Sequence, residues 1–496
     1  MHFKATIFFL AIFSVFIISI TGNTGCANII PPQGGPRDSI APKLEKATPG
    51  DSSRNFNSKK ITFIFDEFVD VQNVLENLIV SPTPKINPGV DYKLNTVTVK
   101  LKDTLEPNTT YSLNFGNAIK DINESNILKE FTYIFSTGQY IDSLKLNGKV
   151  ILAETGKPDS TLIVMLHTSS DDSVVIKEKP RYIAKLDGQG KFIFNNLPPT
   201  TFYLYALKDD GGTHRYFNDK QLFAFAPRPV IVQLKTDSIT LYAFAAKPAL
   251  QQPAVTTTNL VNRNKTGISN SDKRLKYQTN LINNIQQDLL SDFIMTFEQP
   301  LRLFDSSKIR LYTDSTFTPA TAYRFIKDSS NRKLQLNYPW KENTKYHLIL
   351  DKDFADDSSG KKLLKTDTLN FSTKKISDYA ILKLKFSHLD ISRNPVLLFV
   401  LNNNIVKSFP LSNADFSQSL FLPGEYELRI LYDDNKNGKW DPGEFFGKHK
   451  QPEIVKPIER RINVKAGGEN EFEIDVTSIT PKGDDNNRKK PDNQKF

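Results

Sequence analysis

Cysteine is almost absent from this chain of 496 residues, in which Cys26 is the single thiol. One cysteine cannot form a disulfide within the chain, so the folded parts depend on their hydrophobic cores. Histidine is also scarce, and none of the six histidines is paired with another at the spacing of a zinc site. The chain has no HExxH motif, no GxSxG motif and no glycine-rich phosphate loop.

Carboxylates are plentiful, and two of them across a groove could serve a glycosidase. The best pair, Asp66 and Glu67, consists of neighbouring strand residues whose side chains point to opposite faces. We therefore expect that the protein is not an enzyme, with a hydrolase on an unfamiliar β-fold as the remote alternative.

A long apolar run occurs at residues 5–20, ATIFFLAIFSVFIISI, and is followed by the small-residue segment TGNTGC. Sixteen residues are few for a helix that spans a bilayer, which needs about 20. This layout is typical of an export signal, and a short transmembrane anchor is the alternative. We therefore expect a signal peptide over residues 1–25.

Cys26 comes directly after this run, where it can be cut, lipidated and used as a membrane anchor. The stretch resembles a bacterial lipoprotein signal with Gly25-Cys26 as the cleavage junction, although Asn23 stands where an aliphatic residue is usual. The resemblance implies a covalent diacylglycerol and an acyl chain such as palmitate on Cys26, and an outer-membrane location. Ala27 is compatible with that location, and the sequence leaves open the periplasmic face or the cell surface. The Pro- and Gly-rich residues 26–42 are expected to form the tether.

The formal net charge is +10, with a pI near 9.2. Lys and Arg are scattered through strand-like segments and form no dense stripe. This pattern favours an ordinary solvated surface, with attraction to anionic lipid or lipopolysaccharide as the alternative. No nucleic-acid-reading motif accompanies the charge, so no nucleic-acid partner is expected.

Two segments share the same text at matched spacing. The strand-like ITFIF of residues 61–65 recurs as FIMTF at residues 293–297. Asn108-Thr-Thr-Tyr is followed 28 residues after its Asn by Ser136, and Asn343-Thr-Lys-Tyr is followed 29 residues after its Asn by Ser372. Short β-rich runs between turn residues predict a β-sandwich for each copy, with the motif tyrosine entering the core.

A second kind of module follows each of these copies. Its first copy contains the hairpin turn Asp187-Gly-Gln-Gly and then a strand over residues 202–207. Near the C-terminus, residues 422–428 (LPGEYEL) match Leu197-Pro198 and the start of the strand that follows them. Both copies then enter an Asp-rich loop, at residues 208–212 and 432–435.

VSP at 80–82, NTTY at 108–111 and FSTG at 135–138 resemble the SbsA-type bacterial Ig-like domain. The second module resembles carboxypeptidase-regulatory or Cna-B-like domains, which are transthyretin-like sandwiches. The whole order, with CANIIPP at the start and GKWD near the end, is similar to Ig-like outer-membrane lipoproteins of Bacteroidota. We expect an all-β protein of tandem β-sandwiches with these parts: signal peptide 1–25, lipidated tether 26–42, bacterial Ig-like domain 43–138, Cna-B/transthyretin-like sandwich 141–246, linker 247–273, second, diverged Ig-like domain 274–375, second transthyretin-like sandwich 376–476 and disordered tail 477–496. Residues 275–290 fit either an opening strand with a loop or a short helix.

Residues 433–444 fit the calcium-loop pattern D-x-[DN]-x-[DN]-G-x₅-E at every position. Alternate oxygens on such a curling loop converge on one hard cation. The predicted ligands are Asp433, Asn435, Asn437, the carbonyl of Lys439, Asp441 and Glu444. The alternative is a turn without a metal, because Asp, Asn and Gly also favour turns. Lys436 and Lys439 lie in the loop, and only three of the predicted ligands are carboxylates, so we expect weak affinity for calcium.

A strand precedes this loop, since residues 426, 428, 430 and 432 are apolar or aromatic at alternate positions, and Pro442-Gly443 prevents a helix after it. We therefore expect structural calcium that stiffens a loop between strands, and no ion in the partner loop near Asp209. The predicted role is a lipid-anchored outer-membrane binding or scaffold protein. It would be an accessory subunit of an envelope protein complex with an outer-membrane protein partner, and a surface adhesion or glycan-binding module is the alternative.

Overall fold

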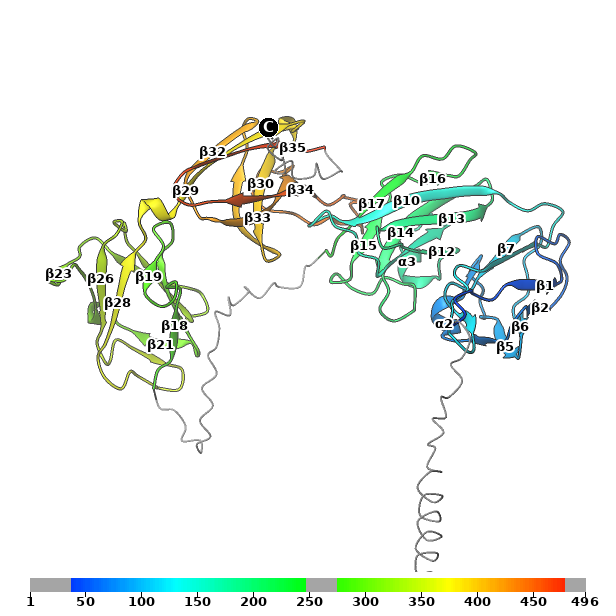
Figure 1. The fold of residues 1–496 in the computed structure, drawn as a ribbon, viewed down its shortest axis with the longest axis horizontal. Coiled ribbons are helices and arrows are strands. Elements are labelled where there is room, and N and C mark those ends of the chain that lie inside the picture. Colours follow the sequence, from blue (N-terminus) through cyan, green and yellow to red (C-terminus); the bar gives the residue numbers. More distant parts are fainter. Residues whose placement is uncertain (1–36, 247–273, 478–496) are drawn as a thin grey trace, which may run out of the picture. The chain divides into compact units, whose positions relative to one another are not determined.

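The computed structural model describes residues 37–246 and 274–477 (Figure 1). These residues form an all-β protein of several β-sandwich modules, as predicted. The α-helices among them are the single turns α2 (Val74–Asn77) and α3 (Val174–Lys177). Contacts divide the chain into two compact units, one ending at Ser143 and the other beginning at Leu144. The predicted signal peptide, most of the tether, the linker and nearly all of the tail lie outside the described residues.

The first module is a β-sandwich whose strands alternate buried and exposed residues. In β2 (KITFIF), for example, Ile61, Phe63 and Phe65 are completely buried. Its sheets have the orders β1-β2-β6-β5, β4-β7-β9 and β3-β8. Its strands are β1 (Leu44–Thr48), β2 (Lys60–Phe65), β3 (Val69–Val71), β4 (Ile79–Ser81), β5 (Gly89–Lys93), β6 (Thr96–Lys100), β7 (Thr110–Asn114), β8 (Ile119–Asp121) and β9 (Thr132–Ser136).

The third module repeats this strand order with two short additions. Its sheets run β18-β20-β25-β24, β19-β28-β26-β22-β23 and β21-β27, so that β19 and β23 have no counterpart in the first module. Residues 275–290 form strands and a turn, and no helix. The strands are β18 (Tyr277–Thr279), β19 (Gln286–Gln287), β20 (Phe293–Phe297), β21 (Leu301–Phe304), β22 (Ile309–Thr313), β23 (Thr318–Pro319), β24 (Arg324–Lys327), β25 (Lys333–Asn337), β26 (Lys345–Leu350), β27 (Ala355–Asp357) and β28 (Asp367–Thr373). The 3₁₀ turns are η1 (Ser306–Lys308) and, after the module, η2 (Ile376–Asp378).

The shared Asn-Thr-x-Tyr text forms the same corner in both modules. Asn108 and Asn343 adopt left-handed φ angles of 50° and 49°, which asparagine tolerates well. The tyrosines that follow, Tyr111 and Tyr346, enter the cores as predicted. The Tyr111 hydroxyl accepts a hydrogen bond from the Glu106 amide at 2.8 Å, and that of Tyr346 accepts one from the Lys341 amide at 3.2 Å.

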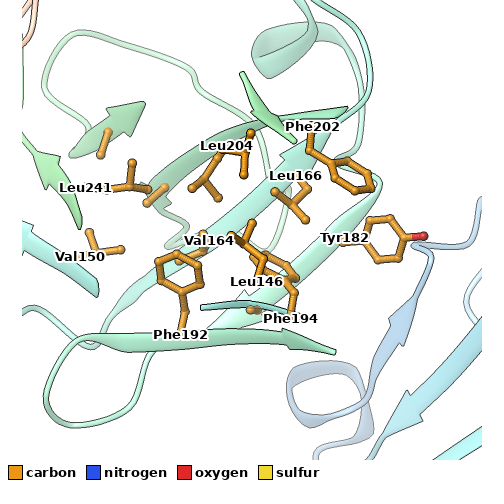
Figure 2. Packing of buried hydrophobic residues seen from close by; sticks show 14 of the residues in the cluster. Leu146, Val150, Val164, Leu166, Tyr182, Phe192, Phe194, Phe202, Leu204 and Leu241 are labelled. Atoms are coloured by element: carbon orange, nitrogen blue, oxygen red, sulfur yellow. The ribbon is translucent and has the colours of Figure 1, made fainter. Parts of the chain in front are cut away.

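The second module places two sheets face to face, in the orders β13-β10-β17 and β12-β11-β14-β15. Figure 2 shows the side chains that fill the space between them, among them Leu146, Val164, Phe192 and Phe202. Strand β10 pairs in parallel with β17, and this pairing joins the two ends of the module. The strands are β10 (Leu144–Leu152), β11 (Leu162–His167), β12 (Tyr182–Lys185), β13 (Lys191–Leu197), β14 (Thr201–Lys208), β15 (Phe223–Phe225), β16 (Val230–Ile231) and β17 (Ile239–Ala243).

The fourth module has the same topology as the second. Its sheets run β32-β29-β35 and β31-β30-β33-β34, and β29 pairs in parallel with β35 as β10 does with β17. The long connection between β33 and β34 therefore corresponds to the one between β14 and β15. The elements are β29 (Ala380–Ser387), η3 (Ile391–Arg393), β30 (Pro395–Leu401), β31 (Asn404–Pro410), β32 (Asp415–Phe421), β33 (Gly424–Tyr432), β34 (Ile454–Val464) and β35 (Glu469–Asp475).

Candidate cation loop at a junction of two modules

The candidate loop begins where β33 ends. Tyr426, Leu428, Ile430 and Tyr432 are all buried in the core of the fourth module, which confirms the predicted strand. After the loop, residues 442–453 contain no helix. A core strand therefore holds one end of the loop in place.

Asp433 organises the first half of the loop. Its side chain is buried, with 2% of its surface exposed. One carboxylate oxygen accepts a hydrogen bond from the Asn437 amide at 3.2 Å, and the other accepts one from the Gly438 amide at 2.6 Å. Gly438 has a φ of +75°, a conformation that glycine adopts at no steric cost.

Asn435, Asn437 and Asp441 meet above this turn. The side-chain amides of both asparagines donate to Oδ2 of Asp441, at 2.6 Å in the case of Asn437. Their side-chain oxygens accept from backbone amides further along the loop, those of Asn437 and Lys439. The fold thus brings together four of the six predicted ligand residues.

Within the part of the chain that the structure describes, no hydrogen bond links the Glu444 side chain to these four residues. Its carboxylate forms an ion pair with Lys448 at 2.8 Å and is half exposed, and its backbone forms a two-bond bridge with Lys450. The backbone amide of Lys439 donates to Asn437. Gly443, the neighbour of Glu444, lies so close to Phe244 and the Lys450 carbonyl that a Cβ would be 2.7 Å from both, so the chain is tightly packed at this point.

Glu453 is a buried carboxylate beside the loop that the sequence motif does not contain. Its two oxygens accept from the amides of Asp434 and Asp441, at 2.9 and 3.0 Å. Burial raises the pKa of Glu453, the two backbone bonds oppose that rise, and the charges of Asp433 and Asp441 add to it. No sequence signal could have found Glu453, because it lies nine residues beyond the motif and reaches the loop only through the fold.

The donors of this loop fit a hard cation in type, since carboxylate and amide oxygens are the ligands that calcium takes. Asp433, Asn435, Asn437 and Asp441 would hold it. In residues 37–246 and 274–477, however, no three His, Cys, Asp or Glu side chains are placed to hold a metal ion together. Calcium therefore stays a prediction.

The corresponding loop of the second module has the same internal cap. Asp209 accepts from the amides of Thr213 and His214, both at 3.0 Å, which are four and five residues further on, as Asn437 and Gly438 are from Asp433. Gly211 and Thr213 stand at the positions of Asn435 and Asn437, so this loop lacks both asparagine side chains. The hydrogen bonds that the first aspartate of each loop accepts are thus a property of the shared topology.

Beyond the motif, the same connection packs against the second module. Phe445 is 6% exposed and lies among Tyr205, Phe223 and Phe225, with ring centroids 5.0–5.6 Å apart. These residues belong to one cluster, the junction core, which covers the outer face of the β11-β14-β15 sheet. Half-buried Trp440 packs against the junction core and against the outer face of the fourth module's own sheet.

Polar contacts surround the junction core. The Val455 amide donates to the Ala153 carbonyl at 2.8 Å, and His449 Nε2 lies 2.8 Å from a carboxylate oxygen of Asp172. Lys157 pairs with Glu427 at 3.1 Å, and Glu427 pairs with Arg429, which is 4% exposed. Burial opposes ionisation of Glu427, but the bonds from Arg429 and Lys157 prevail and lower its pKa. The junction therefore joins modules that lie more than 130 residues apart in the sequence.

The other predicted site residue, Cys26, lies outside the described residues. Among the described residues, none of the helices has the length and apolar character needed to cross a bilayer.

Comparison with known families concerns the first module. Residues 38–137 match the family model described as "Bacterial Ig-like domain". The first module is a bacterial Ig-like domain. The match covers about a fifth of the chain. No curated protein matches the chain.

Comparison with solved structures finds similar chains at low TM-scores. The Bacillus anthracis TIE protein is 11% identical, with 90% of this chain and 76% of that chain covered and a TM-score of 0.16. The Escherichia coli alpha-2-macroglobulin fragment MG0-NIE-MG1 is 11% identical, with 38% and 90% covered and a TM-score of 0.19. BcpA, the major pilin subunit of Bacillus cereus, is 8% identical, with 67% and 100% covered and a TM-score of 0.17. Likenesses at these TM-scores carry no inference about function.

Proposed function

We propose that this protein is a lipid-anchored scaffold of the outer membrane, an accessory subunit that binds an envelope protein complex through the surfaces of its modules. The observation that carries the proposal is the junction core. It unites the second and fourth modules into one body, and a body of that kind presents fixed surfaces to a partner. The bacterial Ig-like module and the signal-like segment before Cys26 support a place in the envelope.

The anchor is tested by Cys26→Ser in the full-length protein. Because Cys26 would carry the lipid, we expect the variant to leave the membrane fraction, whereas the parent stays in it and floats with outer membranes. A variant that remains as membrane-bound as the parent would contradict the proposal. Binding of the parent to a glycan array, with no protein co-purified from detergent extracts, would favour the adhesion alternative.

We further propose that the loop at 433–441 binds calcium weakly and that the ion stiffens the junction. The support is the convergence of Asp433, Asn435, Asn437 and Asp441, next to the chain segment that carries Phe445. A dissociation constant of 0.1–1 mM, typical of extracellular sites, implies a stabilisation of about 1.4–2.7 kcal/mol at 10 mM calcium.

The test compares unfolding of the full chain in 10 mM calcium and in chelator. We expect the parent to be more stable in calcium, and Asn435→Ala to lose most of the difference without losing the buried cap of Asp433. Asp434→Ala is the matched control, since Asp434 is an exposed neighbour that is outside the ligand pattern, and it should keep the difference. Identical unfolding of the parent with and without calcium would refute the metal and leave a turn without an ion.

A further inference from the structure

Three large apolar side chains are exposed at one corner of the first module. Phe68, Leu94 and Ile122, here called the apolar trio, are 53%, 59% and 56% exposed. Backbone bonds tie their positions together: the Ile122 amide donates to the Phe68 carbonyl at 3.2 Å, and the Leu94 carbonyl accepts from the Val69 amide at 3.0 Å. The trio therefore comes from the start of β3, the end of β8 and the turn between β5 and β6.

Leu94 is an unfavourable residue for its place in the fold. Its φ is +55°, a left-handed conformation that costs a residue with a Cβ about 1–2 kcal/mol. Asparagine or glycine would suit this turn better, and either would avoid an exposed apolar side chain. Leu94 is 59% exposed, so only the smaller part of its surface is buried in the module.

The third module shows that the corner does not require apolar side chains. Its Ser358 amide donates to the Pro300 carbonyl at 2.8 Å, and its Asn331 carbonyl accepts from the Leu301 amide at 2.8 Å. These bonds reproduce those of the first module, so Pro300, Asn331 and Ser358 occupy the positions of Phe68, Leu94 and Ile122. Asn331 has nearly the same φ, +54°. The apolar trio is thus a feature of the first module and not of the shared fold.

Acidic side chains border the apolar trio. Asp66 and Glu67 directly precede Phe68 in the sequence, Asp121 directly precedes Ile122, and Glu124 follows two residues later. Burial raises the pKa of Glu67, and the negative charges of Asp121, Asp66, Asp38 and Glu124 raise it further. Basic groups also lie here: Lys93 directly precedes Leu94, Arg37 donates to the Glu124 carbonyl at 3.3 Å, and Lys120 is 3.9 Å from Asp70. Acidic groups therefore outnumber basic ones beside the trio.

We propose that the apolar trio is the docking surface for a protein partner whose contact face has an apolar centre bordered by Lys and Arg. This inference rests on the proposed function as a subunit of an envelope complex and names the surface that does the binding. An apolar centre with a complementary charged rim is the usual anatomy of a protein interface. The acidic border disfavours an anionic lipid surface, and a second copy would place acid against acid.

The experiment uses the full-length lipoprotein in the cells that produce it. A photoreactive phenylalanine analogue replaces Leu94, and in a matched control it replaces Asn331, the equivalent residue of the third module. We expect one discrete protein adduct from position 94 and none of that mass from 331. The cross-linked partner peptide should be apolar with flanking Lys or Arg, and Glu67→Lys with Glu124→Lys should weaken the adduct. Reversing the flanking charges of the partner should restore it.

Co-purification in mild detergent provides a second measurement. The double variant L94N/I122S carries the residues of the third module at these two positions, so it should fold like the parent. We expect it to reduce the amount of co-purified partner by about tenfold or more. Leu234→Asn, which changes a 92% exposed leucine of the second module, should recover the partner fully.

The outcomes separate this inference from the proposed function. A partner that co-purifies equally with parent and L94N/I122S would overturn the docking surface and leave the subunit role intact. Adducts from position 94 to lipid, to the chain's own upstream residues or to a second copy would also overturn it, as would the absence of any adduct. If no protein co-purifies with the parent, the proposed function itself falls.

Discussion

Replacing Phe445 with alanine should separate the second and fourth modules. The ring is 94% buried and lies within 5.6 Å of three aromatic rings of the second module. The area that an aromatic side chain buries, about 150–250 Å², corresponds to about 4–6 kcal/mol at about 25 cal/mol/Å². Phe→Ala changes in cores cost about 3–5 kcal/mol, and we expect a loss of that order here. Because that free energy lies between modules, the loss should appear as two separate unfolding transitions in place of a joint one.

The assay is chemical unfolding followed by Trp440 fluorescence. The chain has two tryptophans, and Trp340 lies in the third module, so a W340F background leaves Trp440 as the reporter of the junction. Phe446→Ala is the control, since Phe446 is 38% exposed and touches the junction core at its edge, near Tyr216. We expect that control to cost about 1 kcal/mol or less. Equal and small losses for both variants would refute the view that Phe445 holds the modules together.

Two further predictions concern the second module. Burial lowers the pKa of His167 to about 4 from its ordinary 6.5, so the unfolded chain takes up the proton first as pH falls. The stabilisation that neutral His167 provides to the folded state is fully present above pH 6.5. It is lost as the pH falls toward 4, which lowers the free energy of unfolding by about 3 kcal/mol in all. His167→Phe should therefore flatten stability measured between pH 7 and 4, and an unchanged slope would refute the assignment. Gly148→Ala should destabilise by at least about 1–3 kcal/mol, because a Cβ there would lie 2.1 Å from the Ile239 carbonyl oxygen at the parallel β10–β17 pair. Gly188→Ala, in an open turn, should be nearly neutral in the same thermal melts.

The local sequence pattern was sufficient to predict buried strands and a tight turn. Alternation in ITFIF and in residues 426–432 predicted buried strands, and the Asn-Thr-x-Tyr text predicted a turn that sends a tyrosine into the core. These features are determined by side chains a few residues apart, so they can be read before any tertiary contact is known. The repeated text also pointed to two kinds of module, and the matching strand orders of the paired modules agree with it.

The candidate loop shows where local pattern ends. Asp433, Asn435, Asn437 and Asp441 follow the motif and meet, because a single curled loop places them. Glu444 fits the motif equally well, yet its carboxylate pairs with Lys448, and its neighbour Gly443 is packed closely against Phe244 of the second module. Glu453 enters the site from the start of β34, at a separation that no motif specifies.

The amino-acid sequence by itself determined the all-β class, the alternation of buried and exposed residues, and the tight turns, because short-range sterics and the period of a strand govern all three. Only the tertiary structure decided which modules touch and which exposed side chains share a corner. The packing of Phe445 and the grouping of Phe68, Leu94 and Ile122 depend on chain segments that are distant in sequence. Their proximity is a property of the folded chain, since no rule of spacing links residues that meet only after the sheets have formed.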